Sequence, residues 1–379
     1  MLVTQVFEFV NVAQKEVLGE SAITLEDLSN IVDVGKALED LDDGYENFYK
    51  AMANRIGRML FESRTYEGKY KKLYRDSWEF GSIMGKVQAE LLEATENESY
   101  QIINGASYDP YVVNLPVITS KFYNKAVTLE IDVTTPVDQI KQSFKSADEM
   151  VKFASMLEVM VNNSMEVKLE ILASRAVNNL IGATVSSGGA RVINLVTEWN
   201  TSMGTTLNAV TALLDKDFLN YAVSRLLEVK GYLEDYTKLY NLGEKARFTK
   251  GDRLAVEINS TFASRVKTRL ASNTYHDDLV SLPNYEEVSY WQGVGTDGGI
   301  SSRMSIQATI VDEDGETQDV TASNVVCAMF DIDACGIVQP QKKITTAYNA
   351  KAEYYNSFHK WLARYFNDFN QQAVVFTLN

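Results

Sequence analysis

The longest regular pattern of apolar and polar positions runs from Ser146 to Thr184. Apolar side chains recur at the spacing of one helix face, and neither proline nor glycine interrupts them before Gly182. A hydroxyl at Ser146 and a carboxylate at Glu149 have the order of a capping box, which marks the start of a helix. At 1.5 Å per residue the pattern predicts a single helix of roughly 55 Å, with Leu157 facing the core. A helix of this length is expected to act as a spine against which other elements lie.

The residues before this helix begin with short amphipathic stretches. Within residues 1–75 the clearest are Val3 to Val10 and Tyr45 to Phe61, and each is too short to form a core alone. They predict a helical N-terminal arm that needs another surface to lie on.

From residue 78 onward the apolar period changes from helical to two. Apolar and polar residues alternate from Val87 to Leu91 and again from Val127 to Val133, which predicts two strands with one apolar face each. About 35 residues separate the strands, a connection length that is uncommon inside compact domains and is usually functional. A two-stranded hairpin has too little partner surface to be stable alone. This flap is therefore expected to find its missing contacts on a neighbour, such as another copy of the chain.

The rest of the chain mixes helical and strand patterns without an internal repeat, so the predicted fold class is α+β. Tyr348 to Phe369 carries aromatic residues at helical spacing and predicts an amphipathic helix. The other predicted elements are helices over Asp217–Leu242 and Thr261–Ala271 and strands over Arg253–Ile258, Met304–Ile310, Asn324–Ile332 and Ala373–Leu378.

Composition and charge argue against several classes of protein. The chain of 379 residues has a formal net charge of −15, which argues against a protein that condenses nucleic acid or binds an anionic membrane surface. Cys327 and Cys335 are too few for a disulfide scaffold, and we expect them to be small residues of a buried strand and of the turn after it. No apolar run reaches membrane length and no signal peptide is recognisable, so folding in a reducing cytoplasm is expected.

Residues with catalytic potential are sparse. Gly293 to Gly298 matches the dinucleotide-binding pattern G-x-G-x-x-G, but Ile300 to Ile310 has a strand pattern where that motif needs a helix. A loop between two strands is the preferred interpretation. The only histidines, His276 and His359, lie far apart and outside any metal-binding motif. The sequence therefore predicts no catalytic residue, no cofactor and no metal site.

Several strings spread over nearly the whole chain carry a resemblance to a known family. They are Glu26–Gly35, Trp78–Gly81, Asn104–Pro110, Lys121–Lys125, Gln142–Phe144, Tyr348–Tyr355 and Val374–Phe376. Together with the order of arm, flap, long helix and mixed domain, they resemble the major capsid proteins of tailed bacteriophages, which have the Hong Kong 97 fold. More narrowly, the chain is similar to capsid proteins of phages of gut Firmicutes. The strings have no catalytic meaning, so the resemblance implies an architecture and not a reaction.

The resemblance implies a division of the chain into named parts. They are an N-terminal arm over 1–75, an extended β-hairpin loop over 76–142, a peripheral domain with the spine helix over 143–189, a mixed axial domain over 190–340, and a C-terminal segment over 341–379 that returns to the peripheral and axial core.

The resemblance also implies a function in self-assembly. In that family, copies form pentamers and hexamers that tile an icosahedral shell around double-stranded DNA, and the extended loop of one subunit lies over its neighbour. The implied partners are further copies of the chain, a portal, scaffold or decoration proteins, and packaged DNA that is not bound by sequence. No membrane partner is expected. The implied location is the virion, with assembly in the cytoplasm of the bacterial host.

The interface candidates are apolar and basic residues of the arm and of what we expect to be the tip of the loop. They are Phe7, Val10, Lys121, Phe122, Tyr123 and Lys125. Two alternative functions remain open from the residues alone. One is another self-assembling structural subunit, of a tube or a surface layer, and the other is a cytoplasmic nucleotide-binding enzyme that uses Gly293 to Gly298.

Overall fold

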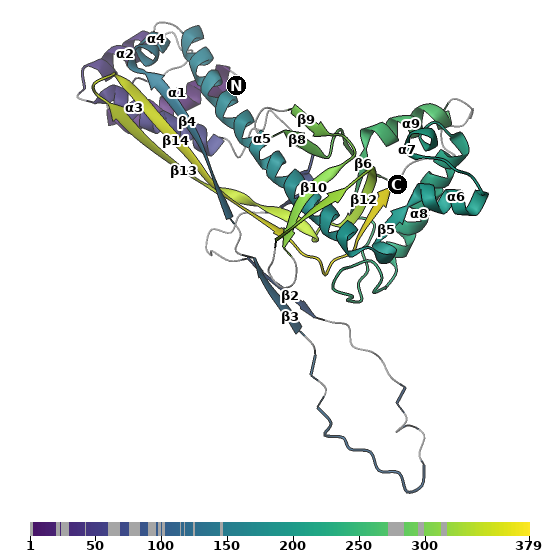
Figure 1. Cartoon of the computed structure of the whole chain (residues 1–379). Coiled ribbons are helices and arrows are strands. Elements are labelled where there is room, and N and C mark those ends of the chain that lie inside the picture. The colour runs from purple at the N-terminus through teal and green to yellow at the C-terminus, as the bar shows by residue number, and fades with distance from the viewer. Residues whose placement is uncertain are drawn as a thin grey trace. The chain divides into compact units, whose positions relative to one another are not determined.

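A computed structural model describes residues 3–19, 23, 30–41, 43–59, 69–75, 84–89, 96–97, 100, 103–113, 115–116, 118–123, 126–144, 147–271, 284–294, 299–311 and 317–379. Internal contacts divide the chain into two compact units. Unit 1 comprises residues 1–79, 126–173 and 337–364, and unit 2 comprises residues 80–125, 174–336 and 365–379. Both units combine helices and strands, which confirms the predicted α+β class (Figure 1).

The N-terminal part of unit 1 is helical, as its amphipathic pattern predicts. Its helices are α1 (Val3–Leu18), α2 (Ile31–Glu39) and α3 (Gly44–Met59). The three helices contact one another. On α3, Phe48 is fully buried and its ring lies 5.1 Å from the ring of Phe144, edge to face. The hydroxyl groups of Tyr49 and Thr135 lie 3.0 Å apart and share a buried hydrogen bond. The arm helices therefore already lie on residues of their own unit.

The sheet of unit 1 has the strand order β1-β13-β14-β4. The strands are β1 (Tyr74–Arg75), β13 (Cys335–Asn349), β14 (Tyr354–Asn367) and β4 (Ala126–Pro136). β4 and β14 are antiparallel, with Tyr354 opposite Pro136 and Arg364 opposite Ala126. β4 is one of the two strands that the alternation of its residues predicts.

The helix predicted over Tyr348–Phe369 is wrong, because these residues form the end of β13, a turn and β14. From Tyr355 to Ala363 every second side chain of β14 is buried, including Trp361. This is the period of a strand, with small and polar residues filling inward positions between the aromatic ones. The helical interpretation followed the aromatic residues together with Ala352 and Leu362. Aromatic side chains are themselves favoured in strands because they pack well on a pleated surface.

The predicted spine is confirmed as α5 (Ala147–Ser187), a continuous helix of 41 residues. Ser146 and its hydroxyl lie outside the described residues. Residues 147–173 of the helix belong to unit 1 and residues 174–187 to unit 2. Leu157 is buried, as the helical period predicts. The helix ends where Gly188 takes a positive φ of 61°, a conformation that glycine adopts without strain. The N–H of Gly188 donates to the carbonyl oxygen of Thr184 at 3.2 Å.

The core of unit 2 is built on a sheet with the strand order β5-β15-β12-β6-β7. The strands are β5 (Val192–Asn194), β15 (Ala373–Thr377), β12 (Val325–Asp331), β6 (Leu254–Asn259) and β7 (Glu286–Val288). The helices of this unit are α6 (Leu195–Met203), α7 (Ala209–Ala212), α8 (Lys216–Glu234) and α9 (Ser260–Ala271). Apolar residues of α6, α8 and α9 form one buried cluster with residues of the sheet, and every residue of β12 and β15 is buried. The strands predicted over Arg253–Ile258, Asn324–Ile332 and Ala373–Leu378 and the helix over Thr261–Ala271 are confirmed, whereas the helix predicted over Asp217–Leu242 ends at Glu234 and residues 235–242 are not helical.

Three antiparallel hairpins of two strands complete the described part of unit 2. They are β2 (Met84–Ala89) with β3 (Ile118–Tyr123), β8 (Gln292–Val294) with β9 (Gly299–Ser302), and β10 (Ile306–Val311) with β11 (Thr317–Ala322). The pairing of β2 with β3 corrects the expected flap, whose second strand was placed at Val127–Val133. That segment is β4, which pairs with β14 instead. The long connection expected inside the flap therefore joins β2 to β3.

The last turns of α5 are fixed to this unit by close packing and by a buried tryptophan. Trp291 donates its indole N–H to the carbonyl oxygen of Val325 at 2.9 Å, and its own carbonyl oxygen accepts from the amide of Asn178 at 2.7 Å. A Cβ added to Gly182 would lie 2.8 Å from the Cβ of Ala308 in β10. The helix and the hairpin approach so closely there that only glycine fits.

Candidate assembly surface

The loop between β2 and β3 concentrates exposed apolar side chains. Its described residues lie beyond the ends of the two strands in Figure 1, and the side chain of Tyr111 is 85% exposed. The exposed large apolar residues of the loop are Tyr100, Ile103, Tyr108, Tyr111, Val112, Val113 and Leu115. Monomeric proteins rarely leave such a group of side chains in contact with water, and a patch of this kind usually marks an interaction site.

The described part of the loop is shaped by local turns. The N–H of Ala106 donates to the carbonyl oxygen of Ile103 at 3.1 Å across the turn at Asn104 and Gly105. Gly105 has a φ of 88°, which glycine adopts at little cost. The N–H of Tyr111 donates to the side chain of Asp109 at 2.9 Å, next to Pro110. These contacts bend the chain between short extended pieces and leave the apolar side chains uncovered.

The base of the loop is anchored by a buried carboxylate. Asp368, directly after β14, accepts from the ammonium of Lys86 at 2.6 Å and from the amide of Gln88 at 3.1 Å, both on β2. On β3, the ammonium of Lys121 lies 3.3 Å from the other oxygen of Asp368. The ring of Tyr123 packs 5.4 Å from that of Phe366. Both strands of the hairpin are therefore held by the same carboxylate.

Burial and the charges of Lys86, Lys121 and Asp368 shift the pKa values of Asp368 and Tyr123. Burial by itself raises the pKa of the Asp368 carboxyl, but the hydrogen bond from Lys86 and the charges of Lys86 and Lys121 outweigh it, so the pKa lies below its ordinary value. Burial raises the pKa of the Tyr123 phenol, and the negative charge of Asp368 raises it further. Asp368 is thus charged and Tyr123 neutral at neutral pH.

A second set of exposed apolar side chains follows one side of the spine helix in unit 1. They are Met156, Val159, Met160 and Val167. Their spacing places them along one stripe of the helix, whereas Phe153, Leu157, Val161 and Met165 face the interior. A helix that is apolar on its exposed side as well as on its buried side is typical of an element with a further partner.

The predicted interface residues differ in their exposure and in their contacts within the chain. Phe122 is 70% exposed on β3 and stays a candidate. Lys121 and Tyr123 are engaged by their own chain, and all three residues belong to a strand at the base of the loop and not to its tip. Val10 is 0% exposed, so its apolar surface is already covered within its own chain. Phe7 lies in α1, and its side chain, like Lys125, is outside the described residues.

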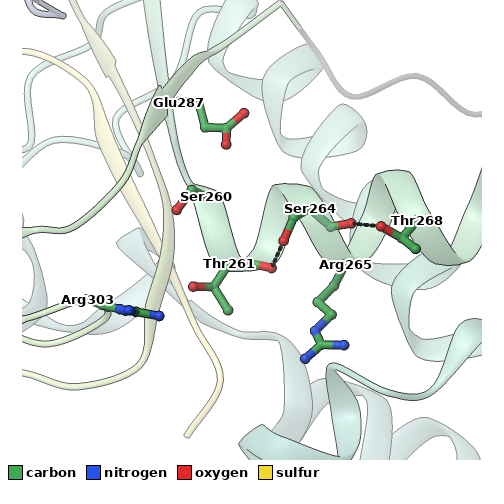
Figure 2. A pocket seen from close by; sticks show the side chains of 7 residues that line it. All are labelled: Ser260, Thr261, Ser264, Arg265, Thr268, Glu287 and Arg303. Carbon is green, nitrogen blue, oxygen red and sulfur yellow. Dashed lines mark hydrogen bonds between the residues drawn. The ribbon is translucent and has the colours of Figure 1, made fainter.

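A polar pocket lies beside α9 (Figure 2). It is lined by Ser260, Thr261, Ser264, Arg265, Thr268, Glu287 and Arg303. The hydroxyls of Ser264 and Thr268 donate to carbonyl oxygens of their own helix at 3.0 and 2.7 Å, and Glu287 pairs with Lys267 at 3.2 Å. The hydroxyls of Ser264 and Thr268 and the carboxylate of Glu287 thus have local partners.

The other sequence features with catalytic potential also have structural partners. Gly293 and Gly299 lie on paired antiparallel strands, which confirms a strand-to-strand connection in place of the strand-to-helix turn of a dinucleotide site. Cys327 is buried in β12, as predicted, and burial, followed by the charge of Glu257, raises the pKa of its thiol well above the ordinary value. Cys335 opens β13 and does not lie in a turn. Among the described residues, no group of acids, histidines and cysteines is arranged to hold a metal.

Comparison with known proteins identifies the family. The model of the Phi29-like phage major capsid proteins matches residues 10–377, which is nearly the whole chain. The chain belongs to the Phi29-like phage major capsid protein family. A comparison with curated protein sequences found no match.

Solved structures support the fold of this capsid protein. The capsid structure of Staphylococcus phage Andhra matches at 11% identity over 84% of this chain and 86% of that chain, with a TM-score of 0.53. A chain from the structure of the head fiber and inner core protein gp22 of native bacteriophage P68 matches at 10% identity over 83% of this chain and 85% of that chain, with a TM-score of 0.50. These likenesses concern the fold, which is that of tailed-phage capsid proteins and is consistent with the Hong Kong 97 fold.

Family membership sets the general class of activity. A major capsid protein is a structural component of a phage particle, so this chain is a structural protein and belongs in the virion. Of the helices that the structure describes, none is long and apolar enough to cross a bilayer.

The sequence interpretation missed the residues that best define the surface. Tyr111, Val112 and Val113 form an apolar run that starts directly after Pro110, and this run was the available signal for the loop contacts. The apolar residues on both sides of α5 were a second signal. For Asp368 no signal existed, because only the fold brings it to Lys86 and Lys121.

Proposed function

We propose that this capsid protein assembles with itself, as pentamers and hexamers, into an icosahedral shell that encloses phage double-stranded DNA. The observation that carries the proposal is the loop between β2 and β3, whose apolar side chains are exposed while its base is firmly anchored. Such a loop suits docking onto a neighbouring copy, where burial of its apolar surface stabilises the contact. Individual contacts need not be strong, because each subunit touches several neighbours and the contacts act together.

The named parts of the chain follow from the same proposal. Residues 1–75 act as the arm, 76–142 contain the extended loop between β2 and β3, 143–189 act as the peripheral domain, 190–340 as the axial domain, and 341–379 as the segment that returns to the core. A portal and scaffold or decoration proteins are further partners of the shell. Assembly takes place in the cytoplasm of the bacterial host. Phe122 and the exposed stripe of α5 are additional contact candidates in the assembled wall.

The test replaces the apolar side chains of the loop without touching its anchor. The variant Tyr111→Ser, Val112→Ser, Val113→Ser removes large exposed side chains, so the subunit keeps its fold and its melting temperature. We expect it to remain as small oligomers or single subunits in electron micrographs and in sedimentation, under conditions where the parent chain forms shells.

A matched control keeps the loop apolar. The variant Tyr111→Phe, Val112→Ile, Val113→Ile preserves the apolar surface and is expected to form shells as the parent chain does. If the serine variant also forms normal closed shells, the loop has no part in assembly.

A further inference from the structure

Asp368 makes contact with both strands of the loop hairpin at a place where the hairpin alone is electrostatically unfavourable. Lys86 on β2 and Lys121 on β3 are direct partners in the antiparallel register. Like charges directly opposite each other across two strands destabilise the pair, and a hairpin of two strands is marginal even without that repulsion. The hairpin by itself is therefore destabilised by repulsion between the ammonium groups of Lys86 and Lys121.

The buried carboxylate of Asp368 resolves this conflict. Its two oxygens lie 2.6 Å from the ammonium of Lys86 and 3.3 Å from that of Lys121, so one negative charge sits between the two positive ones. The side chain of Asp368 is fully buried, and charge pairs away from water are stronger than exposed ones.

Further contacts hold the carboxylate and the strand in place. The backbone N–H of Asp368 donates to the carbonyl oxygen of Ala334 at 2.6 Å, and the N–H of Asn370 donates to its carboxylate at 3.2 Å. The Lys86 ammonium also donates to the carbonyl oxygen of Asp333 at 3.0 Å. Arg247 donates to the side-chain oxygen of Gln88 at 3.0 Å. The carboxylate is thus held by its own segment, and Lys86, Gln88 and Lys121 of the hairpin make polar contacts with this part of unit 2.

We propose that Asp368 is a positioning residue that couples the folding of the β2–β3 hairpin to its seating on unit 2, so that the loop is held in one direction for docking. Without the carboxylate, Lys86 and Lys121 repel each other and the hairpin opens. With it, strand pairing and seating occur together. The role of the hairpin in docking rests on the proposed assembly function. The effect of Asp368 on the hairpin concerns a single subunit and can be measured without assembly.

The titratable and charged groups around Asp368 determine the pH range over which the hairpin stays seated. They are Lys86 from β2 and Lys121 and Tyr123 from β3. Arg247 donates to Gln88, which in turn contacts Asp368, and the backbone carbonyl oxygen of Asp333 accepts a hydrogen bond from the Lys86 ammonium. Because the pKa of Asp368 lies below its ordinary value, its contribution to stability is present above the ordinary pKa of an aspartate and is lost as the pH falls through the lowered pKa. The hairpin is therefore expected to stay seated between pH 7 and about 5, and to open only in stronger acid.

Hydrogen exchange of the full chain, kept as dilute subunits, tests the proposal. In Asp368→Asn the amides of residues 84–89 and 118–123 should exchange about tenfold faster or more than in the parent chain, because the repulsion is no longer neutralised. The exposed carboxylate Asp319, on the separate β10–β11 hairpin, supplies the control, and Asp319→Asn should leave exchange in β2 and β3 unchanged.

A rescue variant separates charge neutralisation from a merely structural role. In the triple variant Asp368→Asn, Lys86→Met, Lys121→Met no like charges remain, so protection of the hairpin should recover part of the loss seen in Asp368→Asn. If the single variant fails to fold, Lys121→Met alone is measured. It keeps the Lys86–Asp368 pair and removes the repulsion, so its hairpin should exchange no faster than in the parent chain.

Two results would overturn the proposal. One is exchange in Asp368→Asn within twofold of the parent chain, and the other is a triple variant no better protected than Asp368→Asn. Micrographs of the parent chain are recorded in parallel. Absence of shells there would contradict the assembly function, whereas the exchange data on single subunits would still decide the role of Asp368.

Discussion

Leu157 and Met160 lie less than one turn apart on α5 but in different surroundings. Leu157 is 5% exposed and Met160 is 42% exposed. Leu157→Asp loses the burial of an apolar side chain and places a charge in the interior, which together cost about 4 kcal/mol or more. We expect this variant to be unfolded or to melt far below the parent chain in circular dichroism. An unchanged melting curve would mean that Leu157 faces solvent.

Met160→Asp is the matched substitution on the exposed side. It should change the free energy of unfolding by no more than about 0.5 kcal/mol, because the new charge stays in water. If the exposed stripe of α5 is a contact surface, this folded variant should form fewer shells than the parent chain. Normal shells in electron micrographs would remove the stripe from the assembly surface.

At the residue scale, periodicity could predict which side chains are buried but not whose surface covers them. Val10 has the pattern of an interface residue, yet its own unit already buries it. Lys121 and Tyr123 were expected at a loop tip, although they anchor its base. A pattern of apolar and polar positions is the same whether the partner is the same chain or another, so only the fold separates the two cases.

At the element scale, the close approach of α5 and β10 gives a test that depends on packing alone. Gly182→Ala brings a methyl group to 2.8 Å from the Cβ of Ala308. Overpacking of this kind costs about 1–3 kcal/mol, which exceeds the gain in helix propensity of about 1 kcal/mol. The melting temperature should fall.

Gly231→Ala, in the last turn of α8, is the control for that substitution. No atom lies within 4 Å of the Cβ that it would add. Only the propensity gain remains, so the free energy of unfolding should rise by about 0.5–1 kcal/mol. Equal effects of the two substitutions on the melting temperature would contradict the packing of α5 against β10.

Element prediction succeeded where one pattern was long and failed where two patterns overlapped. α5 is predictable because its apolar period persists over many turns without a helix breaker. β14 was mistaken for a helix because its aromatic residues also fit a helical period, and the buried Ser357 and Ala363 between them were not counted as inward positions. The partner of β2 was misplaced because the alternation predicts a strand but not the strand that it pairs with.

At the scale of the whole molecule, the net charge predicts a weak affinity of the chain for nucleic acid. A protein with a formal net charge of −15 has little capacity to neutralise phosphates, which supplies most of non-specific DNA affinity. We expect a dissociation constant weaker than about 10⁻⁴ M for a short duplex at about 150 mM salt, measured by fluorescence anisotropy. A micromolar dissociation constant for the duplex would contradict the expectation that the shell encloses DNA without binding it tightly.

The central claim is that this capsid protein reaches its finished form only among copies of itself. Electron cryo-microscopy of the purified parent chain at high concentration tests this most directly. The account predicts closed icosahedral shells built from pentamers and hexamers, with the loop after β2 ordered on a neighbouring subunit. A population of single particles of 42.5 kDa that persists at high concentration would contradict it, and so would open tubes or flat sheets.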